Sequence, residues 1–466
     1  MSAVDPLSVP AAAAGSALAP AREAFATRLG VLLATLGSAV GLGNIWKFPT
    51  LTGANGGAAF LCVYLLATFA VALPVMIAEL AIGRRARADA VTSFERLAPD
   101  GSGRRWRWVG GAGVLAAVLL LAFYSEVAGW VFAYLADAVS GTALSTDAAA
   151  NAARFGALSA DPLRALGWQW LVLAGTALIL ACGVTRGIEA VTRRLMPVLF
   201  LLLALLAVRA LLLPGAAEGL KFLFAPDFSK LTAGVVLTAL GLAFFKLSLG
   251  IGAMVTYGSY FRADQDIPRT ALRVMLADLS VSLLAGIAIF PAVFSFGVEP
   301  SAGPALVFMT LPAVFAQLPF GGLLLALFFA LMAIAATGAM LSILEVPVAW
   351  LVQRGWPRPR AALLATLAVA LPGVPAALSQ GVLADATLFG RTAFELYDFA
   401  SSGVLMPLVA IATALFVGRA WTRTQFADAL GGTVGRPSRL AFALRVLLRW
   451  VAPVAIAVVL VRGWIG

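Results

Sequence analysis

The sequence predicts an all-α protein with many membrane-spanning helices, and two observations lead to this prediction. Of the 466 residues, 62% are hydrophobic and only 12% are charged, about half the charged fraction of a typical soluble domain. Apolar stretches long enough to cross a bilayer core of about 30 Å recur at 29–50, 58–83, 108–139, 168–184, 190–213, 233–260, 272–297, 321–353, 360–378, 394–418 and 440–463. We therefore expect eleven spans and a lipid bilayer around the chain.

The N-terminus and the loops predict the orientation. The first 21 residues are rich in Ala, Ser and Pro and lack the basic start and apolar core of a signal peptide, so we expect a disordered cytoplasmic tail. Lys and Arg number 33 against 22 Asp and Glu, and most of the basic residues fall in segments that the predicted spans place on the same side of the membrane as the N-terminus. Basic loops face the cytoplasm, which places the C-terminus outside an inner (plasma) membrane. The same distribution argues against a nucleic-acid partner.

Composition and motifs exclude several other classes of function. There is no histidine, and the two cysteines, Cys62 and Cys182, both lie in apolar stretches. A disulfide scaffold, a Cys/His metal site and a histidine proton switch are therefore not expected. The sequence has no motif for nucleotide binding, nucleophilic catalysis or metal-assisted hydrolysis, so we expect neither an enzyme nor an organic cofactor.

The first and sixth spans contain residues that ordinary helices avoid. The first reads GSAVGLGNIWKFP, and the sixth reads FFKLSLGIGAMVTYGSY. Glycine can serve close helix packing, but an unwound turn would also free amides and carbonyls to hold a substrate and ions. Because the two breaks are five spans apart, we predict two five-helix repeats of opposite topology, at 22–213 and 214–418, followed by a loop and an eleventh helix at 419–466.

Longer motifs resemble a known transporter family. REAFATRLGVLLATLGSAVGLGNIWKFPTLTGANGGAAF resembles the opening of the neurotransmitter:sodium symporter family, and YSEVAGW, LPGAAEGLKFLFAPDFSKL, FFKLSLGIGAMVTYGSYFRADQDI, LLAGIAIFP and LYDF follow in the order of the family. The resemblance implies the LeuT-type inverted repeat, with helices one and six unwound around a central site. It also implies secondary active transport by alternating access.

The resemblance assigns a substrate pocket. Amides at the helix-one break, Gly41 to Gly43, would hold a substrate carboxylate together with the Tyr124 hydroxyl, because the positive end of a half-helix attracts an anion. Monoamine-transporting members carry an aspartate where this chain has Gly41, so an amino acid is expected. The substrate-binding residues implied are Ser38, Ala39, Gly41, Leu42, Gly43, Leu120, Tyr124, Phe245, Lys246, Ser248, Ile251, Ala339 and Ile343. They are mostly apolar, which favours a neutral, hydrophobic amino acid.

Both sodium sites depart from the pattern of the family. The first keeps Ala39 and Asn44, but Lys246 stands in place of a threonine and Asp278 in place of an asparagine. The second could draw carbonyls from Gly37, Val40 and Ala335, but it has Gly338 and Ala339 where hydroxyl side chains belong. A shift of one residue in the alignment would restore Thr337 at this second site. The requirement for sodium therefore stays open.

Lys246 is the most informative departure, since the chain uses 29 Arg and only four Lys. An ammonium at the bilayer centre costs about 2.5 to 3.5 kcal/mol, and a lone buried carboxylate is similarly unfavourable, so we predict that Lys246 pairs with Asp278. We hypothesise that the ammonium replaces the first sodium ion and touches both Asp278 and the substrate carboxylate. The pair could instead be a static link between helices, or it could take up and release a proton during transport.

Two other functions stay open at this point. One is a conventional sodium-coupled amino acid symporter. The other is a membrane sensor that binds an amino acid without moving it, which the loss of the ion sites would permit. Chloride is not expected, because Tyr64 and Ser282 match chloride ligands of the family but Leu242 stands in place of a glutamine.

The gates and the remaining acids complete the expectations. Lys47 and Asp398 would form the outer gate above the lid Phe245, and Arg22 and Tyr260 match inner-gate residues. Gln353 replaces the acid of the inner gate, so its latch should be weaker or differently paired. Glu79 and Glu345 fit the family as hydrogen-bond partners in helix packing, and Glu126 is left unexplained.

Overall fold

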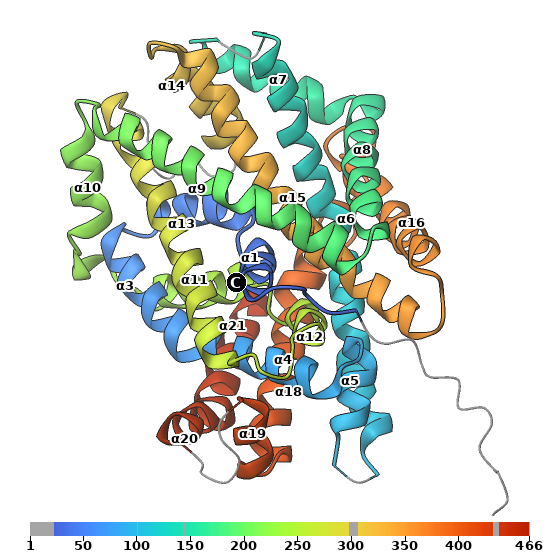
Figure 1. Cartoon of the computed structure of the whole chain (residues 1–466). Helices are drawn as coiled ribbons and strands as arrows, with labels where there is room; N and C mark the ends of the chain where they lie inside the picture. Colours follow the sequence, from blue (N-terminus) through green and yellow to red (C-terminus); the bar gives the residue numbers. More distant parts are fainter. Residues whose placement is uncertain (1–22, 100, 143–144, 298–305, 432–437, 466) are drawn as a thin grey trace, which may run out of the picture.

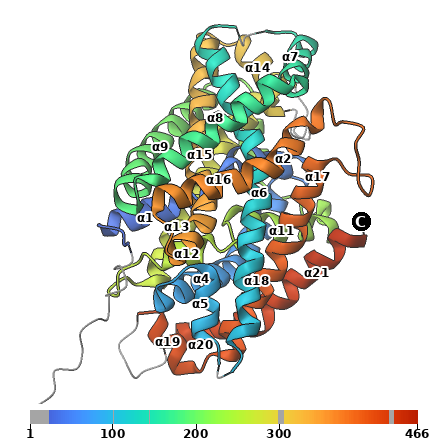
Figure 2. The same cartoon turned by 90° about the vertical axis from the view of Figure 1, so that its right-hand side faces the viewer.

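The computed structural model describes residues 23–99, 101–142, 145–297, 306–431 and 438–465, and this part of the chain is a bundle of helices (Figures 1 and 2). Nine of its helices, some with a π-helical turn, are long and apolar enough to cross a bilayer. They are Ala58–Ala86 (α3, η2, α4), Gly103–Val139 (α6), Pro162–Ala181 (α8), Val184–Leu211 (η3, α9), Ile267–Ser295 (α13), Gly321–Gln353 (α15), Arg358–Gln380 (α16, η6), Ala393–Ala420 (α17, η7, α18, η8) and Arg439–Arg462 (α20, η9 and most of α21).

The predicted first span is a bent pair. Helix α1 (Arg28–Ala39) ends where the backbone of Val40 becomes extended. The chain resumes as the π-helix η1 (Gly43–Lys47) and then α2 (Phe48–Ala54), and the two parts meet at 54°. If this pair is one span, the described chain has ten, and nine of the eleven predicted spans are uninterrupted helices.

The predicted sixth span consists of two short helices, α11 (Ala233–Lys246) and α12 (Ala253–Gly258). Between them the backbone has positive φ at Ser248, Gly250 and Gly252, with values of 52°, 78° and 75°. Glycine takes this conformation freely, whereas a serine pays about 1 to 2 kcal/mol for it. Neither piece is long enough to span a membrane alone, so an eleventh crossing stays a prediction.

Helix starts are defined by side-chain caps. Thr27 accepts a hydrogen bond from the Gly30 amide at the start of α1. Asp161 caps α8 and Asp266 caps α13, and each is followed within two residues by proline, which suits the first turn of a helix. The sequence located these helices by their apolar runs, and the caps set the residues at which the helices begin.

Shorter helices connect the long ones: α5 (Ala90–Leu97), α7 (Ala148–Ala160), α10 (Ala216–Phe224), η4 (Phe228–Lys230), η5 (Leu306–Thr310), α14 (Leu311–Ala316) and α19 (Arg423–Ala429). In Figures 1 and 2, α7 and α14 lie at one end of the bundle and α19 and α20 at the other. The long helix α6 packs against α5, α8, α15 and α16. The broken helices α1, α11 and α12 lie near the middle of the bundle (Figure 1), where they can face a central site.

Candidate functional site

A buried ion pair joins the broken sixth span to α13. Lys246 is the last residue of α11, and its Nζ lies 2.9 Å from Oδ2 of Asp278. Both side chains are completely buried. The predicted pair is therefore present. Removing either partner alone would leave an uncompensated charge in the interior.

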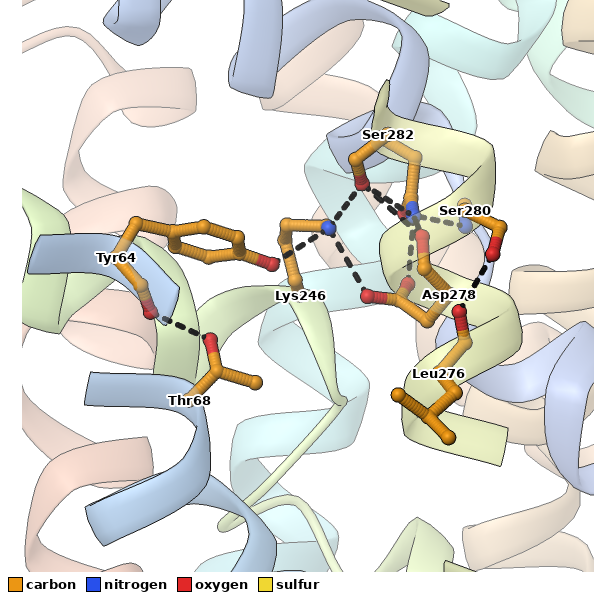
Figure 3. Close-up of polar contacts among 9 residues, drawn as sticks. Tyr64, Thr68, Lys246, Leu276, Asp278, Ser280 and Ser282 are labelled. Carbon is orange, nitrogen blue, oxygen red and sulfur yellow. Dashed lines mark hydrogen bonds and ion pairs between the residues drawn. The ribbon is translucent and has the colours of Figure 1, made fainter. Parts of the chain in front are cut away.

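Two hydroxyl groups complete the surroundings of the ammonium. Lys246 donates to the Tyr64 hydroxyl at 2.8 Å and makes a further hydrogen bond to Ser282. Figure 3 shows the Lys246 side chain between Tyr64 on one side and Asp278 and Ser282 on the other. Because an ammonium has three N–H donors, these acceptors use all of its capacity. A contact with a substrate carboxylate would need one of these bonds to break or to be shared.

The same two hydroxyls are those that the resemblance assigned to chloride. Here they accept hydrogen bonds from a cation. Asn44 belongs to the same cluster, since its amide donates to Oδ1 of Asp278 at 2.5 Å and to Ser282 at 3.1 Å. The cluster thus combines one positive and one negative charge with neutral hydrogen-bonding groups, and its formal charge is zero.

Helices α1 and α15 pack closely at the residues predicted for the second ion site. A Cβ placed on Gly338 would lie 2.7 Å from the Gly37 carbonyl oxygen, closer than nonbonded atoms normally approach. Thr337, which a shifted alignment would bring into the site, donates instead to the Ala333 carbonyl of its own helix at 2.8 Å. The other residues predicted for this site, Val40, Ala335 and Ala339, are buried. Their part in ion binding stays a prediction.

Contacts between helices one, three, six and eight bring together much of the predicted substrate pocket. The Leu42 amide donates to the Tyr124 hydroxyl at 3.1 Å. A Cβ on Gly41 would lie 3.1 Å from the Ala339 Cβ and 3.2 Å from the Tyr124 oxygen, so no larger residue fits here without rearrangement. Tyr124 retains its own proton as a donor for a carboxylate.

Further contacts connect the broken segments themselves. Ser248 donates to the Ser38 carbonyl at 2.9 Å, and a Cβ on Gly43 would lie 3.4 Å from the Phe245 ring. The other predicted pocket residues, Ala39, Leu120, Ile251 and Ile343, are buried. Their contact with a substrate stays a prediction.

The predicted outer gate is not closed. Lys47, Phe245 and Asp398 line one cavity of about 550 Å³, but no ion pair joins Lys47 to Asp398 among the described residues, so their role as a gate stays a prediction. The Lys47 ammonium instead lies 3.8 Å from the centre of the Phe245 ring, a cation–π contact. The buried Oδ1 of Asp398 has no hydrogen-bond partner among the described residues, which leaves it available to a cation.

The predicted inner-gate residue Tyr260 belongs to a cluster with Glu345 and Arg358, and the sequence did not indicate Arg358. Tyr260 donates to Glu345 at 2.5 Å, and Arg358 donates to the other oxygen of Glu345 at 2.7 Å. Arg358 also lies 3.3 Å from Glu23, which precedes α1, and donates to the Leu180 carbonyl at 2.7 Å. Arg22 lies outside the described residues. The inner end is therefore paired differently from the family pattern, through Arg358 and Glu23. A buried acid needs a cation, so Glu345 was the residue in the sequence that could have indicated Arg358.

A second carboxylate fixes the start of helix one. Glu189, at the beginning of the fifth span, accepts hydrogen bonds from the amides of Ala26 and Thr27 at 2.7 and 3.2 Å. Arg28, the first residue of α1, donates to Asp264 of the loop before α13 at 2.9 Å. This hydrogen bond holds the pKa of the exposed Asp264 carboxyl below its usual value.

Arg358 provides a direct test of the latch. Replacing Arg358 by alanine should destabilise the closed inner end by about 1 to 3 kcal/mol, because it strands the buried Glu345. We expect slower uptake and faster thiol labelling of a cysteine introduced below the latch. Arg360→Ala, an exposed arginine two residues further along α16, is the matched control and should change neither rate. Equal labelling in the two variants would show that Arg358 does not close the path.

Glu79 and Glu345 act as the hydrogen-bond partners that the sequence predicted. The Gly250 amide, inside the broken sixth span, donates to Glu79 at 2.8 Å. Glu345 accepts from Tyr260 and Arg358 as described above. Both carboxyls therefore fasten the sixth span to its neighbours.

The motifs, the broken helices and the buried ion pair can be compared with known proteins. The model of the sodium:neurotransmitter symporter family matches residues 22–152 and 158–465. The chain belongs to this family. Its members and structural neighbours are membrane transporters, so the fold is of the LeuT type and the protein is a multi-pass membrane transporter rather than an enzyme.

Individual relatives agree with this assignment. The chain is 41% identical to the uncharacterized sodium-dependent transporter YhdH of Bacillus subtilis, over 93% of this chain and 96% of the relative. It is 36% identical to an uncharacterized sodium-dependent transporter of Haemophilus influenzae, over 85% and 89%. The crystal structure of MhsT in complex with L-phenylalanine superposes with a TM-score of 0.87 at 43% identity and covers 95% of this chain and all of that one.

Proposed function

We propose that this symporter-family member carries neutral, hydrophobic amino acids across the membrane by alternating access. The pocket has Gly41, not a carboxylate, at the helix-one break, and the hydroxyl of Tyr124 lies beside the Leu42 amide. The likeness to MhsT, which was crystallised with L-phenylalanine, supports the same substrate class. Lys47 and Phe245 would close over the substrate from the outer cavity.

We further propose that Lys246 takes the place of the first sodium ion. The observation that carries this proposal is the saturated ammonium, whose three donors are held by Tyr64, Asp278 and Ser282. A sodium ion placed there would meet a fixed positive charge at close range, and repulsion between two such charges in a poorly screened interior is strong. Transport is then independent of sodium at this site.

The second ion site is proposed to be lost as well. The close approach of Gly338 to the Gly37 carbonyl brings the backbones of α1 and α15 together at this site. In this proposal, glycine packing supplies the link that an ion bound by side-chain hydroxyls would otherwise make.

Chloride is proposed to be unnecessary. An anion at Tyr64 and Ser282 would have to displace the Lys246 ammonium from both hydroxyls. Asp278 already supplies one fixed negative charge beside this cation, so no further anion is needed to balance it.

One experiment separates this proposal from its rivals. Purified protein in liposomes is tested for L-phenylalanine uptake with sodium replaced by a bulky organic cation and with chloride replaced by gluconate, with and without an imposed proton gradient. We expect uptake and counterflow to persist after both replacements. Strict dependence on sodium would support a conventional symporter, as the names of the relatives suggest. Saturable binding without counterflow would support a sensor.

We also propose that the N-terminus is cytoplasmic and the C-terminus lies outside an inner (plasma) membrane. The support is the concentration of Arg in loops of one side, as the positive-inside rule requires. Cysteines placed at the two ends and labelled from one side of sealed vesicles test it. Labelling of both ends from the same side would contradict it.

A further inference from the structure

Glu126 is a buried carboxyl group in the middle of α6 that the transport model above does not use. Only 1% of the surface of Glu126 is exposed. Oε1 accepts a hydrogen bond from the Trp130 indole at 2.7 Å, and Oε2 has no hydrogen-bond partner in the described part of the chain. Asp278 and Glu345 each face a cation, but Glu126 forms no ion pair with any described residue. A carboxylate with one hydrogen bond is costly in such a place.

A second oxygen without a partner belongs to the side chain that packs on the same turn of α6. Gln169 of α8 donates to the carbonyls of Ala122 and Gly373, both at 3.1 Å. Because both neighbours are acceptors, the amide orientation of Gln169 is fixed. Its Oε1 is buried and has no hydrogen-bond partner among the residues that the structure describes.

The helix geometry places Glu126 and Gln169 on one side of α6. The carbonyl of Ala122 is the α-helical acceptor for the Glu126 amide, and a Cβ on Gly129, three residues further along, would lie 3.1 Å from the Gln169 backbone nitrogen. The region therefore has two buried acceptors and lacks one donor. A proton on the carboxyl of Glu126 supplies the missing donor and removes the uncompensated charge.

We propose that Glu126 is a proton-binding site whose loading is coupled to transport. In the binding step a hydronium ion gives its proton to the carboxylate, an O–H bond forms at Glu126, and a water molecule is released. Glu126 is tightly packed, and a proton, unlike a metal ion, needs no space for further ligands around the carboxyl. This proposal rests on the transport function proposed above but is independent of the role of Lys246.

The surroundings of Glu126 connect it to the outer gate. Trp130, its hydrogen-bond donor, stacks on Phe394 with ring centres 6.1 Å apart and an interplanar angle of 13°, and Phe123 contacts the same ring at 5.2 Å. Phe394 lines the outer cavity one helical turn before Asp398. Movement of α17 during gate closure would therefore shift the aromatic cover between Glu126 and the outer solution.

The charged and titratable groups on the neighbouring elements do not pair with Glu126. Those on α6 itself and on the helices packed against it include Tyr124, Tyr134, Glu95, Arg96, Arg164, Glu345, Arg358, Glu395, Tyr397 and Asp398. No hydrogen bond or ion pair joins any of them to Glu126 within the described residues. Trp130 is thus the polar contact that positions the carboxyl.

Proton-driven uptake tests the proposal in liposomes, with L-phenylalanine as the probe. For one coupled proton, an inward gradient of one pH unit should raise accumulation by up to about tenfold. We expect Glu126→Gln to lose this response while retaining counterflow, which needs no net proton movement. Glu218→Gln is the control, since Glu218 is an exposed carboxyl on α10 that lies outside the sites described above. It should keep the response.

An infrared titration provides a readout that does not depend on transport. The unaltered protein should show the carbonyl band of a protonated carboxylic acid that disappears at high pH, and Glu126→Gln should lack this band. Trp130→Phe, which keeps the ring stacking but removes the indole donor, should shift the frequency of this band because the hydrogen bond to Oε1 is lost. Identical bands in the unaltered protein and Glu126→Gln, or an unchanged gradient response in Glu126→Gln, would overturn the proposal. If counterflow is absent from every variant, the transport proposal fails and the infrared band alone decides on the proton site.

Discussion

Replacing Lys246 by alanine should destabilise the protein by about 3 to 5 kcal/mol, because it leaves Asp278 buried without its cation. Asn44 would be the remaining side-chain donor to that carboxylate among the contacts seen here. We expect a large fall in the thermal unfolding temperature in detergent and a loss of L-phenylalanine uptake. Lys47→Ala removes a lysine of the first predicted span that makes only a cation–π contact, and it should destabilise the protein by about 0.5 to 1 kcal/mol.

Double substitutions distinguish ion replacement from a static link. Lys246→Ala combined with Asp278→Ala should be less destabilised than Lys246→Ala alone, because no unpaired charge is left behind. Lys246→Thr with Asp278→Asn rebuilds the ligand types that the family uses for sodium, and we expect it to gain sodium-stimulated binding of L-phenylalanine. Normal uptake by Lys246→Ala, or no sodium response in the double variant, would show that Lys246 does not stand in for an ion.

Replacing Gly250 by alanine should also have a large effect, a destabilisation of about 2 to 5 kcal/mol. A Cβ there would lie 2.2 Å from the Met406 carbonyl oxygen, which costs about 1 to 3 kcal/mol as overpacking. The φ of 78° adds about 1 to 2 kcal/mol for any residue with a side chain. Thermal unfolding in detergent measures the sum. Uptake should fall as well, because Gly250 belongs to the broken sixth span and its amide binds Glu79.

Gly355→Ala separates the two contributions. Gly355 has a φ of 90°, but nothing lies within 4 Å of a Cβ placed on it. This variant should therefore lose only the backbone part of the stability and keep normal uptake. If Gly250→Ala and Gly355→Ala were equally stable, the close approach to Met406 would have no energetic importance.

The candidate site was predictable where the free-energy cost of burying a single charged residue demands a partner. A lysine at the centre of an apolar span needs a buried acid, so the pairing of Lys246 with Asp278 could be predicted from the sequence with the help of the family resemblance. The recruitment of Tyr64 and Ser282 by the ammonium was not predicted, because the resemblance assigned them to an anion. Only the folded arrangement shows which charge these hydroxyls face.

The inner and outer gates show the same limit. Matching by position indicated Lys47 with Asp398 and Arg22 with Tyr260, but a gate pair depends on the conformation of the chain as well as on residue type. In this structure Lys47 lies on Phe245, and Arg358 joins Glu23 to Glu345. Such contacts join residues from elements far apart in the sequence, and a local motif carries no information on them.

By itself, the sequence determined that this protein is helical and membrane-embedded, where its helices lie, and that two of them are interrupted, because hydropathy and glycine act over a few neighbouring residues. It also determined that a charge at membrane depth must have a partner. Tertiary structure alone decided that Gly338 approaches the Gly37 carbonyl, that Arg358 serves the inner latch, and that Glu126 and Gln169 each have an oxygen without a donor. These features are set by distances between packed helices, and a difference of one methyl group or one proton changes them.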